Sequence, residues 1–190
     1  MSIRLQFDRI PPGVEVGPHR HGVETIVFVA AGELVFEHGE NLEHRTVVGP
    51  GDVLYEAPAE YHLVRNEGPI DVLALLASVP EPDDADVALR RWTAASEPVR
   101  RRADAREVEA DGIRRRLLVR PGDFGSATFA VAEVELDPGV ADTWHRHPGA
   151  EHAMVVFEGR GLITVGRITE TLAFMRACGI DPERAPELRS

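Results

Sequence analysis

Short apolar segments that alternate with glycine- and proline-rich turns restrict the fold of this chain more than any other feature. Four segments near the N-terminus are predicted as β-strands: Val23–Val29, Glu33–His38, Val53–Ala57 and Val72–Ala77. The turn signals around them are Pro11-Pro12-Gly13, Ala31-Gly32, Gly49-Pro50-Gly51 and Glu67-Gly68-Pro69. Short strands at this spacing indicate an antiparallel sandwich or barrel rather than alternating strands and helices. We therefore predict an all-β fold.

A second stretch of the chain repeats this pattern after a charged segment. Its predicted strands are Leu117–Val119, Ala127–Leu136, Ala153–Phe157 and Leu162–Val165. The likeness indicates an internal duplication. We expect four regions: a first barrel over 1–79, a charged linker over 80–111, a partial second barrel over 112–166 and a helical tail over 167–190. Helices are predicted at Ala85–Ala95 in the linker and at Thr169–Cys178 in the tail.

Composition excludes several classes of function. The chain has 190 residues, of which 43% are apolar and 28% charged, as in globular proteins. A formal charge of -11 argues against a nucleic-acid partner, because phosphate binding needs a basic surface. All 21 basic residues are arginine, which excludes a lysine Schiff base and a Walker-type phosphate loop. The triplets Arg100–Arg102 and Arg114–Arg116 stand among acidic residues, so we expect a solvated surface there.

The sequence also bears on the compartment. It contains no apolar stretch of membrane-spanning length, so we expect no membrane partner. The first residues, Met1–Leu5, lack the apolar core of a signal peptide. Cys178 is the single cysteine and allows no intrachain disulfide, as is usual in a reducing cytosol. We therefore expect a cytoplasmic protein.

Five of the eight histidines fall into two groups with the spacing of metal ligands. In the first group, five residues separate Gly13 from His19-Arg20-His21, and Glu24 and Thr25 follow. In the second, five residues separate Gly139 from His145-Arg146-His147, and Glu151 and His152 follow. Residues two apart in an extended segment face the same side at about 6.6 Å, so the two imidazoles of each pair can converge on one ion.

These motifs resemble those of the cupin superfamily. The family's first motif is matched by Gly13, His19, His21 and Gly32, and again by Gly139, His145, His147 and Gly159. Its second motif is matched by Gly51, His62 and Asn66, although Ala57 and Ala59 replace the expected proline and glycine. The resemblance covers about residues 1–79 and 112–166. With two such stretches, the chain resembles bicupins, which carry two barrels on one chain. The resemblance implies a double-stranded β-helix, or jelly roll, with a divalent ion (Fe, Mn, Zn or Ni) inside each barrel.

The chain departs from the family pattern at the metal-binding glutamate. In the first copy Thr25 occupies that position and Glu24 precedes it; in the second, His152 occupies it and Glu151 precedes it. Neighbours on a strand point to opposite faces, so at most one member of each pair can reach the ion. The resemblance thus implies the ligands His19, His21, His62 and optionally Glu24 in the first barrel, and His145, His147 and either Glu151 or His152 in the second. Glu24 is also the candidate general base.

The second copy is incomplete. No histidine follows His152, so the family's second motif is missing there. An incomplete barrel exposes a sheet edge, which favours cover by the tail or by a second copy in a homodimer. The tail from Thr169 onward resembles a short segment of class II DAHP synthases, and we predict no activity from it.

Two functions remain open at this point. One is a metal-dependent enzyme that acts on a small organic metabolite as a dioxygenase, isomerase, decarboxylase or cyclase. The alternative is a non-catalytic cupin that binds or senses a small molecule. A further possibility is that the histidines of the motifs are core or surface residues that bind no metal ion.

Overall fold

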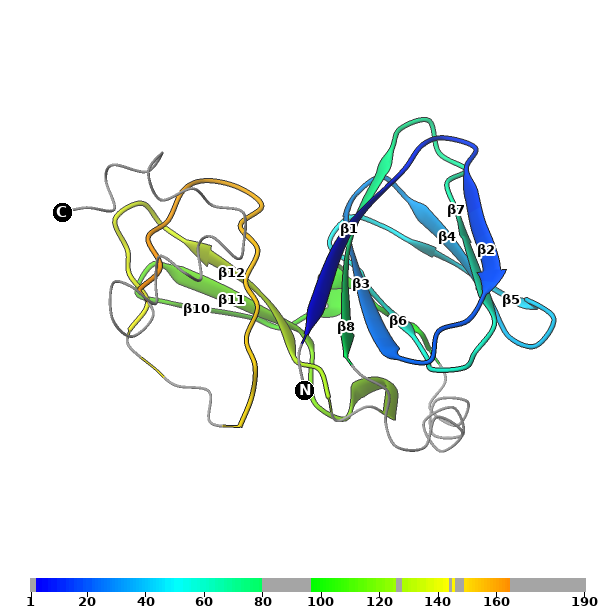
Figure 1. The fold of residues 1–190 in the computed structure, drawn as a ribbon. Coiled ribbons are helices and arrows are strands. Elements are labelled where there is room, and N and C mark those ends of the chain that lie inside the picture. The colour runs from blue at the N-terminus through cyan, green and yellow to red at the C-terminus, as the bar shows by residue number, and fades with distance from the viewer. Residues whose placement is uncertain (1–2, 80–96, 126–127, 144, 146–148, 165–190) are drawn as a thin grey trace. The chain divides into compact units, whose positions relative to one another are not determined.

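The computed structural model describes residues 3–79, 97–125, 128–143, 145 and 149–164 (Figure 1). The chain divides into two compact units, Met1–Glu151 and His152–Ser190. Strands dominate the described residues of the first unit, which confirms the all-β prediction. The helical turns seen there are two short 3-10 helices, η1 (Arg102–Asp104) and η2 (Asp123–Gly125). Both predicted helices, Ala85–Ala95 and Thr169–Cys178, lie outside the described residues.

The strands of the first unit form three antiparallel sheets. Their bounds are β1 Arg4–Ile10, β2 Glu15–His19, β3 Glu24–Ala31, β4 Leu34–His38, β5 His44–Val48, β6 Val53–Glu56, β7 His62–Arg65, β8 Val72–Val79, β9 Val99–Arg100, β10 Glu107–Ala110, β11 Ile113–Val119 and β12 Val131–Leu136. One sheet has the order β1-β8-β3-β6-β9 and a second has the order β2-β7-β4-β5. The third sheet is β10-β11-β12. Within the described residues, no helix is long and apolar enough to span a membrane.

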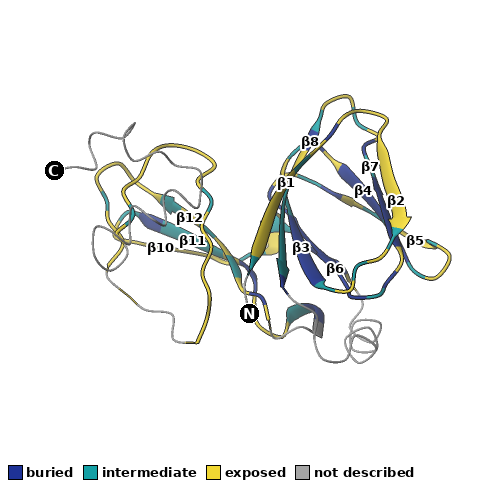
Figure 2. Ribbon diagram, in the orientation of Figure 1, coloured by how far each residue is buried: buried dark blue, intermediate teal, exposed yellow. Residues whose placement is uncertain are grey.

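The first two sheets enclose the main core. Side chains from both sheets meet in one buried cluster: Ile10, Val27, Val29, Leu34, Phe36, Val48, Leu54, Val64, Val72, Ala74 and Val99. Figure 2 shows this arrangement as buried strands β3, β4 and β6, whereas β2 is exposed along most of its length. Two antiparallel sheets around one core form the double-stranded β-helix that the sequence motifs imply.

The five-stranded sheet is buried on both faces near β3 and β6. Its second face carries Ile26 and Tyr55, which pack with Leu118, Phe124 and Phe129 in another buried cluster. The Tyr55 and Phe124 rings are stacked with centroids 5.0 Å apart. Burial on both faces explains why these strands read as unbroken apolar runs rather than as alternating apolar and polar residues.

One motif glycine has a clear structural reason. Gly32 turns the chain between β3 and β4 with a φ of +74°, in the left-handed region that side chains disfavour. A Cβ atom at this position would lie 2.6 Å from the Asp71 carbonyl oxygen. Since that neighbour is backbone, the turn has no room for any larger residue.

Residues 99–110 were expected in the linker and instead form β9, η1 and β10. Strand β9 extends the five-stranded sheet beside β6. The Asp52 carboxylate secures this segment, because it accepts hydrogen bonds from the Arg101 guanidinium (2.8 Å) and from the Arg102 backbone N–H (2.9 Å).

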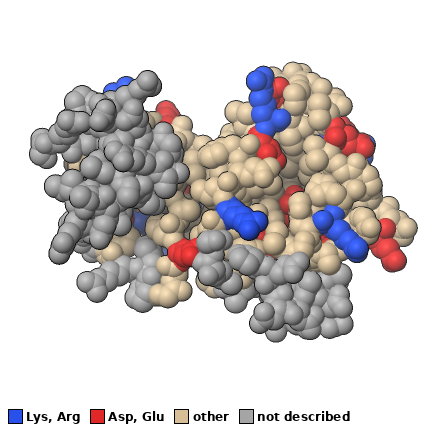
Figure 3. All heavy atoms as spheres, in the orientation of Figure 1, with Lys and Arg blue, Asp and Glu red and all other residues tan. Residues whose placement is uncertain are grey.

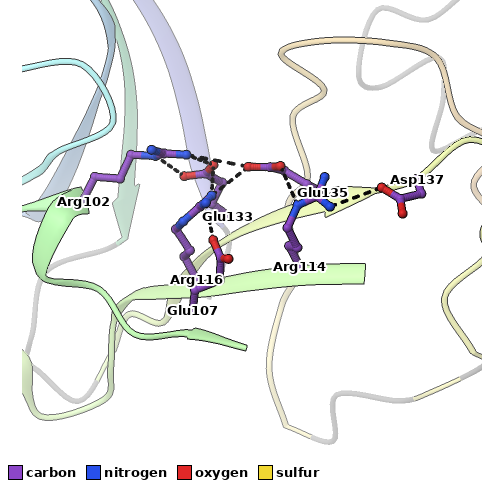
Figure 4. A network of polar contacts seen from close by, with 7 residues as sticks. All are labelled: Arg102, Glu107, Arg114, Arg116, Glu133, Glu135 and Asp137. Atoms are coloured by element: carbon purple, nitrogen blue, oxygen red, sulfur yellow. Dashed lines mark hydrogen bonds and ion pairs between the residues drawn. The ribbon is translucent and has the colours of Figure 1, made fainter. Parts of the chain in front are cut away.

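Arginines of both triplets are engaged in ion pairs on the three-stranded sheet (Figure 4). The β11–β12 register places Arg114 opposite Glu135 and Arg116 opposite Glu133. Arg102 also forms a bidentate pair with Glu133, at 2.7 and 2.6 Å. Glu107 contacts Arg116, and Asp137 accepts from Arg114 at 3.3 Å. On the face that Figure 3 shows, the described arginine and acidic side chains lie in small separate patches.

The predicted strands Ala153–Phe157 and Leu162–Val165 are wrong where the structure describes them. Residues 152–164 contain no regular secondary structure. A strand needs a hydrogen-bonded neighbour, and the sequence lacks the second-motif segment that would supply one. The predicted Leu117–Val119 lies inside β11, and Ala127–Leu136 shortens to β12. The structure therefore does not support a tandem barrel. The division of the chain into four regions stays a prediction, with bounds 1–79, 80–111, 112–166 and 167–190.

Asn66 ties together three backbone segments at the end of β7. Its side-chain amide donates to the carbonyls of Ile10 (2.8 Å) and Ile70 (2.7 Å), and its side-chain oxygen accepts from the Gly68 N–H (2.9 Å). The residue is 1% exposed. Water therefore cannot replace these bonds.

We expect Asn66→Ala to lower the free energy of unfolding by about 2 kcal/mol, because it leaves buried carbonyl groups without donors. Denaturant titration measures the change. Asn41→Ala, at an exposed turn position, serves as the control and should change stability by less than about 0.5 kcal/mol. Equal stability of the Asn66 and Asn41 variants would contradict the assigned role.

The ion-pair network predicts a pH dependence of stability. Hydrogen bonds from Arg116 and then Arg114 lower the pKa of Glu135 from 4.5 to about 2. The folded state then favours the charged carboxylate, so its contribution is present above pH 4.5 and is lost as the pH falls toward 2. We expect Glu135→Gln to be less stable than the parent at neutral pH, with the difference narrowing over this window. The exposed Glu40→Gln variant should show a smaller, flatter difference in the same unfolding titrations.

Candidate metal centre

Strand pairing brings His19 and His62 together. β2 and β7 are antiparallel neighbours, and His19, the last residue of β2, lies directly opposite His62, the first residue of β7. His21 follows two residues later in the chain, beyond the end of the strand. The three imidazoles thus come from one strand end, the loop after it and the start of the neighbouring strand.

The three rings form a compact triad. Ring centroids are 4.7 Å apart for His19 and His21, 4.5 Å for His19 and His62, and 5.0 Å for His21 and His62. One nitrogen from each ring lies within 4.8 Å of the other two. The Nε2 atoms of His19 and His21 are 3.2 Å apart. Among the described residues, this triad is the group of histidine, cysteine and acidic side chains that could hold a metal ion.

His62 is held in the orientation that a ligand needs. Its Nδ1 lies 3.1 Å from the Glu60 carbonyl oxygen, to which a protonated Nδ1 donates. That tautomer leaves the Nε2 lone pair free, as in metal sites whose second ring nitrogen is fixed by a carbonyl. Nε2 is buried and has no hydrogen-bond partner among the described residues. The donor set therefore fits a divalent ion.

Burial favours the neutral form of two histidines of the triad, His62 and His21. It lowers the pKa of His62 to about 4, and the neighbouring His19 and His21 add to this effect. Burial also lowers the pKa of His21, with His19 as the second cause. Neutral imidazole is the form that binds metal ions. The site is thus prepared for a cation at neutral pH.

Glu24, the predicted ligand and general base, lies on the other face of β3. In the β3–β6 register, Thr25 pairs with Glu56 and Ile26 pairs with Tyr55, so Glu24 shares a face with Ile26. The Tyr55 hydroxyl donates a hydrogen bond to Glu24 Oε1 at 3.0 Å. Burial and then the Glu24 charge raise the pKa of Tyr55. In this register Thr25, rather than Glu24, shares a face with Glu56 on the histidine side of the sheet.

A different carboxylate, Glu56, lies beside the histidines. Its oxygens are 3.5 Å from His21 Nε2 and 3.7 Å from His62 Nε2. Burial, with a smaller effect of Asp8, raises its pKa to about 8. The sequence does not mark Glu56 as a ligand, because it lies outside the family's metal-binding positions. The signal in the sequence that could have identified Glu56 is its position as an acidic residue inside the otherwise apolar run Val53–Ala57.

His38 and His44 lie outside the two histidine groups and differ in exposure. His44 is exposed, but His38 is buried, with Nδ1 3.1 Å from Glu60 Oε1. The strands explain this difference, since β4 lies between β5 and β7 whereas β5 is at the sheet edge.

The second histidine group is not assembled in the described part of the chain. His145 is exposed, with Nδ1 2.8 Å from the Thr143 carbonyl oxygen. Glu151 accepts a hydrogen bond from the Ile3 N–H at 2.8 Å, and His152 is exposed. His147 lies outside the described residues. A second metal site on these four residues stays a prediction.

Comparisons with known proteins give one family match and several similar solved structures. Residues 6–77 match the cupin domain family. Similar solved structures include a predicted oxalate decarboxylase from Thermotoga maritima, at 28% identity over 40% of this chain and 64% of that one, with a TM-score of 0.37. A Thermus thermophilus protein is 26% identical over 42% and 74% of the two chains, with a TM-score of 0.38.

A cupin 2 conserved barrel domain protein from Salinispora arenicola is 21% identical over 47% of this chain and 71% of that one, with a TM-score of 0.38. The chain spans less than two thirds of the length of the Thermotoga maritima protein. A search of curated proteins finds no match. The family match covers the part of the chain in which two antiparallel sheets enclose one core, so residues 6–77 are similar to a cupin domain in both sequence pattern and fold.

Proposed function

We propose that the cupin domain binds one divalent metal ion through His19, His21 and His62 and acts with it as an enzyme on a small organic metabolite. The observation that carries the proposal is the convergence of three ring nitrogens within 4.8 Å of one another. Imidazole ligands suit zinc, iron, copper and nickel, so the donor set leaves the identity of the ion open.

Access to the triad supports a reaction with a small molecule. His62 forms the closed side, with a side chain that is 0% exposed, whereas the His21 side chain is 33% exposed. When bound, a metal ion with an open position polarises a substrate oxygen or activates oxygen or water. The protein's part is to hold the imidazoles in place, through the β2–β7 pairing and the Glu60 carbonyl.

The wall beside the triad favours a polar ligand. Thr25 pairs across the sheet with Glu56 on one side and with Ser78 on the other. Directly opposite residues share a face, so a row of polar residues crosses the interior face of this sheet next to the apolar core. Such a surface supplies hydrogen bonds to a polar metabolite.

A non-catalytic binding or sensing role is the second candidate. It is favoured by Thr25, which stands where the cupin pattern has a glutamate, and by the absence of strands over the described residues 149–164. Both roles use the same metal ligands. A homodimer remains a proposal that rests on the incomplete second half.

We predict that His19→Ala and His62→Ala reduce bound zinc or iron to a small fraction of the parent's content, because either change removes one of three nitrogen donors. Elemental analysis after metal loading and desalting measures this. His44→Ala, whose ring is exposed, is the matched control and should keep the parent's metal content. Metal retention in both triad variants would exclude this site.

Oxygen uptake distinguishes the two roles. We expect the iron(II)-loaded protein to consume O₂ with at least one substrate from a panel of flavonoids, diketones and amino-acid derivatives, and the His19→Ala variant to consume none. An oxygen electrode measures both rates. Metal binding without turnover for this panel, and without release of CO₂ or isomerised product, would favour the binding role.

A further inference from the structure

Two buried polar atoms at the histidine triad have no hydrogen-bond partner among the described residues. They are His62 Nε2 and Glu56 Oε2. Glu56 is 4% exposed and His62 is 0% exposed. A buried polar atom without a partner costs free energy of about 1–3 kcal/mol, so folded proteins rarely keep one without a reason. Two such atoms at one place indicate a shared partner that is neither backbone nor side chain.

The distances around Glu56 are those between ligands of one ion. Ligand atoms about 2.1 Å from a tetrahedral ion lie about 3.4 Å apart. The His19–His21 nitrogens are 3.2 Å apart, and Glu56 lies 3.5 Å from His21 Nε2 and 3.7 Å from His62 Nε2. These separations exceed ordinary hydrogen-bond lengths for the two Glu56 contacts, yet they match the edges of a coordination polyhedron.

We propose that Glu56 is the carboxylate ligand of the metal ion and replaces, from strand β6, the ligand that Thr25 cannot supply from strand β3. This inference rests on the proposed metal site. The sheet register supports it, because Thr25 and Glu56 are directly opposite each other. Opposite residues have Cβ atoms about 5 Å apart and share a face, so a glutamate can reach the same space from either position.

The other two buried glutamates near the triad each have a partner away from it, although Glu60 Oε2, like Glu56 Oε2, has no hydrogen-bond partner among the described residues. Glu24 is on the opposite face of β3 and accepts a hydrogen bond from the Tyr55 hydroxyl. Glu60 Oε1 lies 3.1 Å from His38 Nδ1. Glu56 is thus the carboxylate whose oxygens approach two triad nitrogens.

Isosteric amide variants test the inference by metal affinity. Glu56→Gln should bind zinc or cobalt(II) about tenfold or more weakly in calorimetric titration, the scale seen when support for a metal site is lost. Glu24→Gln is the matched control, since it changes a buried glutamate on the other face of the same sheet; it should keep the parent's affinity. Thermal unfolding of the metal-free proteins provides a second readout. Glu56→Gln should be as stable as the parent without metal and gain less stability when metal is added.

A positional rescue provides the sharper comparison. Glu56→Thr removes the carboxylate, and the double variant Thr25→Glu/Glu56→Thr restores one from the opposite strand. We expect the double variant to bind zinc more tightly than Glu56→Thr alone. Equal affinities of these two folded variants would overturn the equivalence of the two positions.

The outcomes separate this inference from the proposed function. Parent protein that binds zinc through the histidines, together with Glu56→Gln of unchanged affinity, overturns the role of Glu56 alone. Loss of affinity in Glu24→Gln with none in Glu56→Gln would assign the carboxylate to Glu24. Parent protein that binds no zinc, cobalt or iron overturns the metal site itself.

Discussion

Antiparallel pairing of strands with fixed register is the constraint on which the site depends. A shift of one residue between β2 and β7 would remove His62 from His19, and the same shift between β3 and β6 would exchange Glu56 for Tyr55 on the interior face. The apolar core fixes the β3–β6 register, because Val27 and Leu54 lie opposite each other and both point into it. The geometry of a few polar side chains is therefore determined by the packing of many apolar ones.

Much of the N-terminal barrel can be predicted from the sequence. The four strands with continuous apolar runs correspond to β3, β4, β6 and β8, since their burial leaves a strong signal. The strands β1, β2, β5 and β7 are harder to predict, because they are short, carry charged residues or lie at edges. The His-X-His motif and the later histidine identify the triad before any coordinates, as their strands must be neighbours in this fold.

The carboxylate beside the histidine triad cannot be identified from sequence patterns alone. Counting along the chain leads to Glu24 or Thr25, and strand alternation allows only one of them. Which residue faces the histidines depends on the register with a neighbouring strand, and so does the arrival of Glu56 from that strand. The strand predictions for residues 153–165 fail for a related reason. Apolar residues such as Val155 and Val156 have a high strand propensity, but a strand forms only where a neighbouring strand can pair with it.

Burial of Tyr55 beneath Phe124 and Phe129 means that the cooperative folding unit extends past the boundary of the recognised domain. A fragment cut after β8 would keep every histidine of the triad. It would, however, expose to water the apolar face of β3 and β6 that Leu118, Phe124 and Phe129 cover. Leu118, Phe124 and Phe129 therefore belong to the packing of the barrel sheet, on the face opposite the histidines.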